Sequence, residues 1–405
     1  MAVLTNVAHA KKPVTIVFWH GQAGPLGELL NKLVDRFNKS QGDVVVKPEF
    51  VGDWTALNQK IMAAVSVSQP PDLAQVGEIA YTDTYLKAGV IAPVQRFMDS
   101  DPTFKEMVQK DFYAGFLREN TYAVGGRNVL VSWPFAKAIT VLFYNQEMLQ
   151  QAGFNRPPAT WAEFREVAKA LTIPGKRWGF AFTPNALRVL PAVILQNGGS
   201  LVSEDQTKAL FDSPEAIGAV QLFVDLVKKD QSSYVTKGFD WQNDLVAGKV
   251  AMAANTIVSQ AYIQRDIQNR FHLGVAPLPA GPKEGTLLYG PNAVIFATKS
   301  KEKQEAAWEF LKWWVEPETM TQWCRESGYI ALRKSVIETM SKEDPSLKVF
   351  IESLAHAQPY PNFAKWTEVR SVLVDGYVKA VLGQATPEDA MKEAARKANS
   401  ILAQP

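Results

Sequence analysis

The sequence predicts an α/β protein of two lobes, each with a mostly parallel sheet flanked by helices. Strand-like runs alternate with helix-like runs from Val14 onward, and the alternation starts again after the long apolar run that ends at Asn145. Such alternation is typical of parallel sheets covered by helices. A chain of 405 residues with 47% hydrophobic residues can bury a large core and usually divides into two domains.

The first half opens with a strand and a helix. "VTIVFW" at 14–19 is β-branched and aromatic, and Pro25 stands where the first turn of a helix tolerates proline. The helical period then continues over 26–40. A strand at 43–52, a helix at 54–68 and a strand at 72–77 are predicted to follow.

The second half repeats this order. Thr160 with Glu163 makes a capping box, and Ser213 before Pro214 marks another helix start. No flexible linker interrupts the chain, so we expect structured crossings between the lobes. Strands are predicted at 248–255, 273–281 and 292–298, and helices at 256–267, 302–315 and after Thr386.

Composition excludes several classes of function. The 43 basic and 41 acidic residues give a net charge of +2, which indicates no nucleic-acid or membrane-surface partner. Cys324 alone can form no internal disulfide, and the four histidines lack metal-ligand spacing, so no metal or cofactor is expected. The spacing of Gly21, Gly24 and Gly27 is not that of a dinucleotide loop.

The N-terminus suggests export. Ala8-His9-Ala10 has the small-x-small pattern of a signal-peptidase site and precedes two lysines. We expect residues 1–10 to be the remnant of an export signal; a disordered tail is the alternative.

The 11 tryptophans are the most unusual feature of the composition. Four of them, Trp19, Trp54, Trp133 and Trp241, stand at predicted strand ends or loops. A tryptophan there offers a flat, amphipathic face for a sugar or another organic ligand, although ordinary core packing is the alternative for each.

Five stretches stand out together, which are "FWHGQAGPLGELLNKLVDRFN", "WPFAKAITVLFYNQEMLQQAGFNRPPATWAEF", "LVAGKVAMAAN", "ESGYIALRKSV" and "VRSVLVDGYVKAVLGQATPEDAM". In this order they resemble the extracellular solute-binding proteins of bacterial ABC importers, of the maltose and glycerol-3-phosphate type, and most of all the sn-glycerol-3-phosphate-binding branch. Their order extends the resemblance from about Val14 to Leu402.

The resemblance implies a type II periplasmic-binding-protein fold that closes on its ligand about a hinge. It implies no catalysis and no cofactor, a monomer exported to the periplasm or cell surface, and membrane permease subunits as partners. The crossings are expected near 136–138, 275–278 and 315–317. The first lobe would comprise residues 11–136 and 277–315, and the second 137–276 and 316–405.

The resemblance also implies a ligand site in the cleft between the lobes. Ala138 stands where the branch has a serine, Trp54 where it has a tyrosine, and Thr256 where it has a serine. By comparison with the ligand-binding positions of this branch, the expected ligand-binding residues are Trp54, Glu78, Thr256, Gly290, Tyr329 and Arg370. Further cleft residues expected are Trp19, His20, Gly24, Asp53, Trp133, Ala138, Trp241 and Asn255.

The chemistry of this set suits a phosphate ester. Arg370 stands beside the apolar stripe of a helix predicted at 365–382, where it either clamps an anion or pairs with a surface carboxylate. Tyr329 and Thr256 add hydroxyl donors. Glu78 would repel a phosphate, so the phosphoryl group is expected toward the second lobe and the ligand's hydroxyls toward Glu78. Ala138 and Trp54 favour a ligand larger than glycerol 3-phosphate, such as a glycerophosphodiester with a ring or a choline-like group.

Two alternatives remain open at the level of sequence. An oligosaccharide would use the same tryptophans, with Asp53 and Glu78 as hydroxyl acceptors, but would leave Arg370 without an anion. A phosphodiester-hydrolysing enzyme on the same scaffold needs a nucleophile or a metal site, for which the composition gives no specific support.

Overall fold

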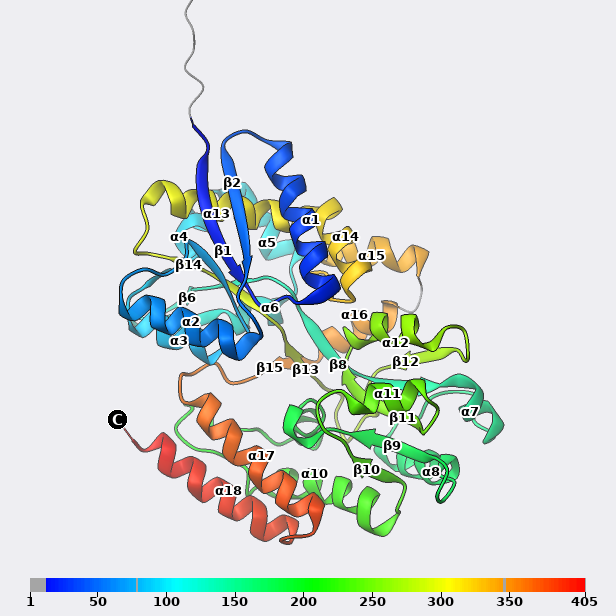
Figure 1. The fold of residues 1–405 in the computed structure, drawn as a ribbon. Coiled ribbons are helices and arrows are strands. Elements are labelled where there is room, and N and C mark those ends of the chain that lie inside the picture. Colours follow the sequence, from blue (N-terminus) through cyan, green and yellow to red (C-terminus); the bar gives the residue numbers. More distant parts are fainter. Residues whose placement is uncertain (1–11, 78, 345–346, 405) are drawn as a thin grey trace, which may run out of the picture.

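The computed structural model describes residues 12–77, 79–344 and 347–404, which form two lobes (Figure 1). Each lobe is built around one β-sheet that helices cover. The predicted two-lobed α/β architecture is therefore confirmed. The expected signal remnant at 1–10 and the predicted ligand residue Glu78 lie outside the described residues.

The sheet of the first lobe is mixed. Its strand β1 pairs in parallel with β2 and β3, whereas β14 runs antiparallel to β3. β14 follows directly from a strand of the second lobe, so it enters the sheet from the opposite end. The order is β2 (Val44–Phe50), β1 (Val14–His20), β3 (Leu73–Val76), β14 (Asn292–Phe296) and β4 (Ile91–Ala92), with β7 (Trp133–Pro134) on β14 and a separate hairpin of β5 (Thr121–Val124) and β6 (Arg127–Leu130).

Two helices of the first lobe begin where the sequence predicts, although the capping role of Asp53 was not predicted. Pro25 lies in the first turn of α1, and Asp53 Oδ1 accepts a hydrogen bond of 2.8 Å from Ala56 N at the start of α2. The carboxylate satisfies one of the amides that a helix start leaves free. The helices here are α1 (Gly24–Ser40), α2 (Trp54–Ser66), α3 (Ala80–Lys87), α4 (Gln95–Asp99), α5 (Pro102–Asp111), α6 (Ala114–Glu119), α13 (Lys301–Trp314), α14 (Pro317–Ser327) and α15 (Lys334–Glu343).

The second sheet is also mixed, and β8 lies at its centre. β8 is almost wholly buried and runs antiparallel to β11, β12 and β13. The prediction of mostly parallel sheets is therefore wrong, because β8, like β14, arrives directly from the other lobe. The order is β10 (Ser233–Val235), β9 (Trp178–Phe182), β11 (Val250–Thr256), β8 (Ala138–Asn145), β13 (Thr286–Tyr289) and β15 (Ala357–Pro359), with β12 (Leu273–Ala276) also on β8.

The predicted helix caps of the second lobe are present. Thr160 Oγ1 accepts from Glu163 N at 3.2 Å, and Ser213 Oγ accepts from Ala216 N at 3.2 Å. The helices are α7 (Gln146–Gln151), α8 (Trp161–Leu171), the short η1 (Pro184–Ala186), α9 (Leu190–Gln196), α10 (Pro214–Val224), the π-helical η2 (Asp225–Lys229), α11 (Asp240–Val246), α12 (Ser259–Ile267), α16 (Lys348–Ala355), α17 (Trp366–Leu382) and α18 (Pro387–Leu402).

The chain passes between the sheets at residues 135–137, after β7, and at residues 290–291, between β13 and β14. The second crossing differs from the expected 275–278, because β12 and β13 both still pair with β8 there. Only two residues separate β13 from β14, so the two strands form a nearly continuous apolar run in the sequence. That run does not indicate that the chain moves from one sheet to the other.

The segment after residue 316 also differs from the predicted boundary. α14 packs on α1, where Arg36 Nη1 lies 2.9 Å from Glu318 Oε1, and Arg333 Nε lies 2.7 Å from Asp111 Oδ2 beside α15. These contacts keep α14 and α15 with the first lobe, whereas β15 pairs with β13 of the second sheet. The amphipathic pattern of a helix indicates that one face is buried but not which lobe covers it.

Candidate functional site

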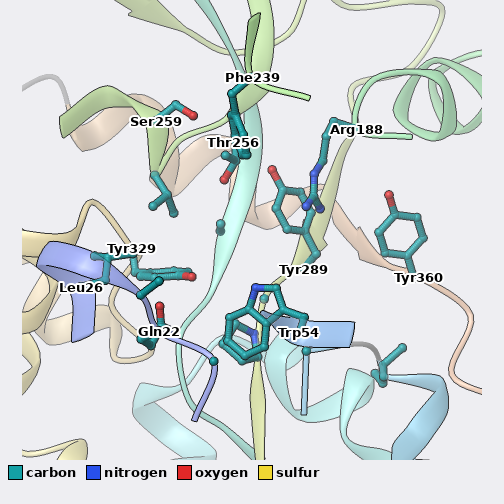
Figure 2. A pocket seen from close by; sticks show the side chains of 18 of the residues that line it. Gln22, Leu26, Trp54, Arg188, Phe239, Thr256, Ser259, Tyr289, Tyr329 and Tyr360 are labelled. Carbon is teal, nitrogen blue, oxygen red and sulfur yellow. The ribbon is translucent and has the colours of Figure 1, made fainter. Parts of the chain in front are cut away.

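A cleft of about 600 Å³ lies between the lobes, and Figure 2 shows side chains from both lobes pointing into it. Its volume is in the range of sites that bind small organic molecules. Five of the six predicted ligand residues line this one cleft, which are Trp54, Thr256, Gly290, Tyr329 and Arg370. The sixth, Glu78, follows the lining residue Gly77 but lies outside the described residues.

Trp54, the first residue of α2, forms part of the first-lobe wall. Its indole lies against two glycines: a Cβ atom on Gly21 would be 2.8 Å from Trp54 Cε3, and one on Gly77 would be 2.6 Å from the same atom. Both positions therefore need glycine for the ring to lie this close to the backbone. The result is a half-buried aromatic face directed toward Tyr289 (Figure 2).

Tyr329 follows Gly328, the left-handed residue that ends α14. Its ring stacks on Trp323 with centroids 5.6 Å apart, and its hydroxyl shares a hydrogen bond with the side chain of Gln22. Burial raises the pKa of Tyr329 to about 12, with the Gln22 bond and the charge of Arg188 acting in the opposite direction. Tyr329 is thus a neutral hydroxyl at physiological pH.

Thr256 ends β11 rather than opening a helix. Its backbone N donates to Asn255 Oδ1 at 2.8 Å, and α12 begins three residues later, at Ser259. The expectation of a helix N-terminus at Thr256 was wrong, because the β-branched run continues the strand pairing with β8 through Thr140. Asn255 is buried beneath this turn and does not line the cleft, whereas Ser259 does.

Arg370 reaches the cleft from α17. Its Nη2 donates to Asn185 O at 3.4 Å, and its guanidinium also hydrogen-bonds the Tyr360 hydroxyl. Tyr360 in turn donates to Leu187 O at 2.5 Å. These bonds hold the N-terminal part of α17 and the turn after η1 together at the wall of the second lobe.

Arg188 stands in the same wall, between Leu187 and Val189. Its Cζ lies 3.9 Å from the centroid of the Tyr289 ring, which is close enough for a cation–π contact. Figure 2 shows this guanidinium in the upper part of the cleft, with Tyr360 on one side. Its charge lowers the pKa of both Tyr329 and Tyr360, against the larger effect of burial.

The back of the cleft is formed by the crossings between the lobes. Gly290 has φ +125°, and a Cβ there would lie 2.2 Å from Ala136 O, so only glycine fits. Lys137 Nζ donates to Gly290 O at 3.0 Å and lies 2.5 Å from Oε2 of Glu119, while Ile330 N donates to Lys137 O at 2.7 Å. Lys137 therefore joins both crossings and the chain after α14. Ala138, the next residue, lines the cleft as predicted.

Two tryptophans predicted to line the cleft belong to the cores instead. Trp133 is fully buried among aromatic rings, with Trp308 at 5.1 Å, and Trp241 is 1% exposed and stacks on Phe143 at 5.8 Å. Both tryptophans therefore have the role given above as the alternative, ordinary core packing, because each ring fills the space between its sheet and a helix.

Four other predicted residues also lie away from the lining. Trp19 Nε1 donates to Glu49 Oε2 at 2.8 Å beside Lys60, and Asp53 is occupied as the cap of α2. His20 is 1% exposed, and burial lowers its pKa to about 4. Gly24 begins α1 and is outside the lining.

The cleft contains residues that the sequence analysis did not single out, above all Arg188, Tyr289, Tyr360 and Gln22. The sequence indicated one of them, since Tyr289 directly precedes Gly290, which was expected to face the cleft. No sequence pattern indicated Arg188. It follows Leu187, a left-handed residue with φ +46° that interrupts any strand or helix period.

Among the described residues, no group of three His, Cys, Asp or Glu side chains is placed to hold a metal ion. No described helix is both long and apolar enough to cross a membrane.

A two-lobed α/β fold with a ligand-sized cleft between the lobes is the architecture of type II periplasmic solute-binding proteins. Residues 32–349 match the family model described as bacterial extracellular solute-binding protein. The chain belongs to this family. It is the non-enzymatic solute-binding component of an ABC importer and acts outside the cytoplasm, in the periplasm or at the cell surface.

Individual relatives cover nearly the whole chain. The chain is 27% identical to the sn-glycerol-3-phosphate-binding periplasmic protein of Yersinia pseudotuberculosis, over 98% of this chain and 94% of that protein. Its structure is similar to that of UgpB from Mycobacterium tuberculosis in complex with glycerophosphocholine, with a TM-score of 0.82, 21% identity and coverage of 97% and 99%. It is equally similar to the cyclic α-maltosyl-1,6-maltose binding protein from Arthrobacter globiformis, with a TM-score of 0.81, 23% identity and coverage of 96% and 99%.

Proposed function

We propose that the protein captures an organic phosphate ester in the cleft and delivers it to the membrane permease of its importer. The observation that carries this proposal is that one cleft is lined by Arg370 and Thr256 from the second lobe and by Tyr329 and Trp54 from the side of the first lobe. A guanidinium with hydroxyl donors around it suits phosphate oxygens.

The similarity to glycerol-3-phosphate-binding proteins over the full chain supports the same ligand class. The ester would lie with its phosphoryl group toward the arginines of the second lobe and its organic part toward Trp54. The cleft volume of about 600 Å³ leaves room for an organic part larger than glycerol. Closure of the lobes about the crossings would then cover the ligand.

An oligosaccharide is the second candidate. Aromatic faces suited to sugar rings line the cleft at Trp54, Tyr262, Tyr289 and Tyr360, and a cyclic-maltosyl-maltose-binding protein has the same fold. A neutral sugar would leave the guanidiniums of the cleft without an anion, and for this reason we place it second.

Calorimetric titration tests the choice between the two. The wild-type protein and Arg370→Ala would each be titrated with sn-glycerol 3-phosphate, glycerophosphocholine and maltotriose. We expect heat from at least one phosphate ester and its loss in Arg370→Ala. Binding of maltotriose alone, unaffected by Arg370→Ala, would replace the phosphate ester with a sugar.

A further inference from the structure

Residues 360–365 join β15 to α17 and form a strap between the lobes. Both of these elements belong to the second lobe, yet the strap passes beneath α3 of the first lobe (Figure 1). Pro359 and Pro361 flank Tyr360, and each proline ring fixes its own φ angle and biases the preceding residue toward an extended conformation. The strap therefore begins as a stiff, extended stretch.

Hydrogen bonds attach the strap to the first lobe at two places. Oδ2 of Asp83, on α3, accepts a hydrogen bond of 2.8 Å from Ala364 N. Asn362 Nδ2 donates to the carbonyl oxygens of Glu119 and Thr121, at 3.4 and 3.3 Å. The strap is thus bonded to α3, to the end of α6 and to β5, although the elements that it joins belong to the other lobe.

The Asp83 carboxylate is buried at this boundary, with 7% of the residue exposed. Lys87, one turn further along α3, has its Nζ 2.8 Å from the same Oδ2 atom, but the lysine side chain is 69% exposed. An ion pair with an exposed lysine stabilises little, whereas a hydrogen bond from an N–H group to a charged acceptor is one of the stronger kinds. We therefore assign the role of Asp83 to its bond with Ala364 N, across the boundary between the lobes.

The strap leads directly into the wall of the cleft. Tyr360 lines the cleft, packs against apolar clusters of both lobes and shares a hydrogen bond with Arg370. The ring of Tyr360 lies 6.1 Å from that of Trp366, which follows Ala364 by two residues and also lines the cleft. The position of Ala364 thus determines where α17 begins, and with it where Trp366 and Arg370 lie.

We propose that Asp83 is a positioning residue of the binding site. It anchors the strap to the first lobe and so holds Trp366 and Arg370 at the wall of the cleft, although Asp83 itself does not line the cleft. This inference goes beyond the proposed function, because it holds for a phosphate ester and for a sugar alike.

Three variants separate the anchoring bond from the ion pair. Asp83→Ala removes both, Asp83→Asn keeps a side-chain oxygen that can accept from Ala364 N, and Lys87→Gln removes only the ion pair. Without ligand, hydrogen–deuterium exchange over residues 364–370 should be at least about tenfold faster in Asp83→Ala than in the wild type. Lys87→Gln should exchange as the wild type does, and Asp83→Asn should retain most of the protection.

Melting temperatures show whether each variant folds. Asn362→Ala releases the other attachment of the strap and provides the same test if Asp83→Ala does not fold. It should also accelerate exchange over residues 364–370.

Calorimetry measures the effect on binding, with sn-glycerol 3-phosphate, glycerophosphocholine and maltotriose as probes. For each probe that the wild type binds, Asp83→Ala should weaken binding by about tenfold. Asp83→Asn should restore most of the affinity, and Lys87→Gln should bind as the wild type does.

The outcomes distinguish this inference from the proposed function. Equal exchange over residues 364–370 in all the proteins would show that Asp83 anchors nothing and would overturn the inference. Faster exchange in Asp83→Ala with unchanged affinity would also overturn it, while the proposed function would stand. If the wild type binds none of the three probes, the proposed function falls, and the exchange alone decides whether Asp83 holds the start of α17.

Discussion

Nζ of Lys137 lies 2.5 Å from Oε2 of Glu119, and both side chains are closed to solvent, with exposures of 0% and 4%. Burial raises the pKa of Glu119 and lowers that of Lys137, and each charge offsets part of the other's shift. The pair lies beside Gly290, where the chain crosses between the lobes.

Breaking this pair is expected to destabilise the protein strongly. Lys137→Met leaves the Glu119 carboxylate buried without a counter-ion, which should lower the free energy of unfolding by about 3–5 kcal/mol. Urea denaturation measures the change. The double variant Lys137→Met/Glu119→Leu removes both charges and should recover much of the loss; equal loss in the single and double variants would contradict the electrostatic explanation.

A methyl group on Gly77 is expected to displace Trp54. The new Cβ would lie 2.6 Å from Trp54 Cε3, so the half-exposed ring must move into the cleft. We predict that Gly77→Ala weakens the binding of glycerol 3-phosphate by about tenfold, with a small effect on stability. Gly42→Ala is the control, because a Cβ there meets nothing within 4 Å. Unchanged affinity in Gly77→Ala would mean that the ring position does not matter for binding.

His20 is expected to make the protein less stable in acid. Its folded-state pKa of about 4 lies below the ordinary value of 6.5 because of burial, so the unfolded chain binds the proton first as the pH falls. The free energy of unfolding should therefore decrease between about pH 6.5 and pH 4, by up to about 3 kcal/mol. His20→Phe, which keeps an aromatic ring beside Phe18, should lose this part of the pH dependence in urea titrations. Parallel curves for the two proteins would exclude His20 as the cause.

Cys324 is expected to be inert in the folded protein. The thiol is buried beside a smaller cavity lined by α12, α14 and α15, and burial raises its pKa. The thiolate needed for reaction is therefore rare. Labelling with iodoacetamide should be at least about a hundredfold faster in 6 M urea than in buffer. Comparable rates in the two conditions would show that the thiol is reachable in the native state.

Much of the fold could be predicted because strand and helix periods and caps are local. Pro25, Thr160 and Ser213 lie at the starts of helices, as their preferences for the first turn and for the cap position predict. The lobe boundaries could not be predicted in this way. Whether β13 pairs with β8 or continues to the other sheet depends on partners far away in the chain.

The candidate site was predictable only in part, for a similar reason. Trp54 and Trp133 look alike in sequence, but one lies on glycine backbones at the cleft and the other fills a core. Arg188 carries no local pattern at all. Its place in the cleft follows only from the fold, which sets its guanidinium over the Tyr289 ring.

The position of β14 in the first sheet has a consequence for biosynthesis. β14 lies between β3 and β4, yet it comprises residues 292–296, and among the described strands β4 pairs with no other. A nascent chain that has reached only residue 290 therefore cannot complete its first lobe, although most of that lobe's residues have been made. We expect such a chain to remain incompletely folded late into translation, when a protein bound for the outside of the cell can still be passed through a secretion channel.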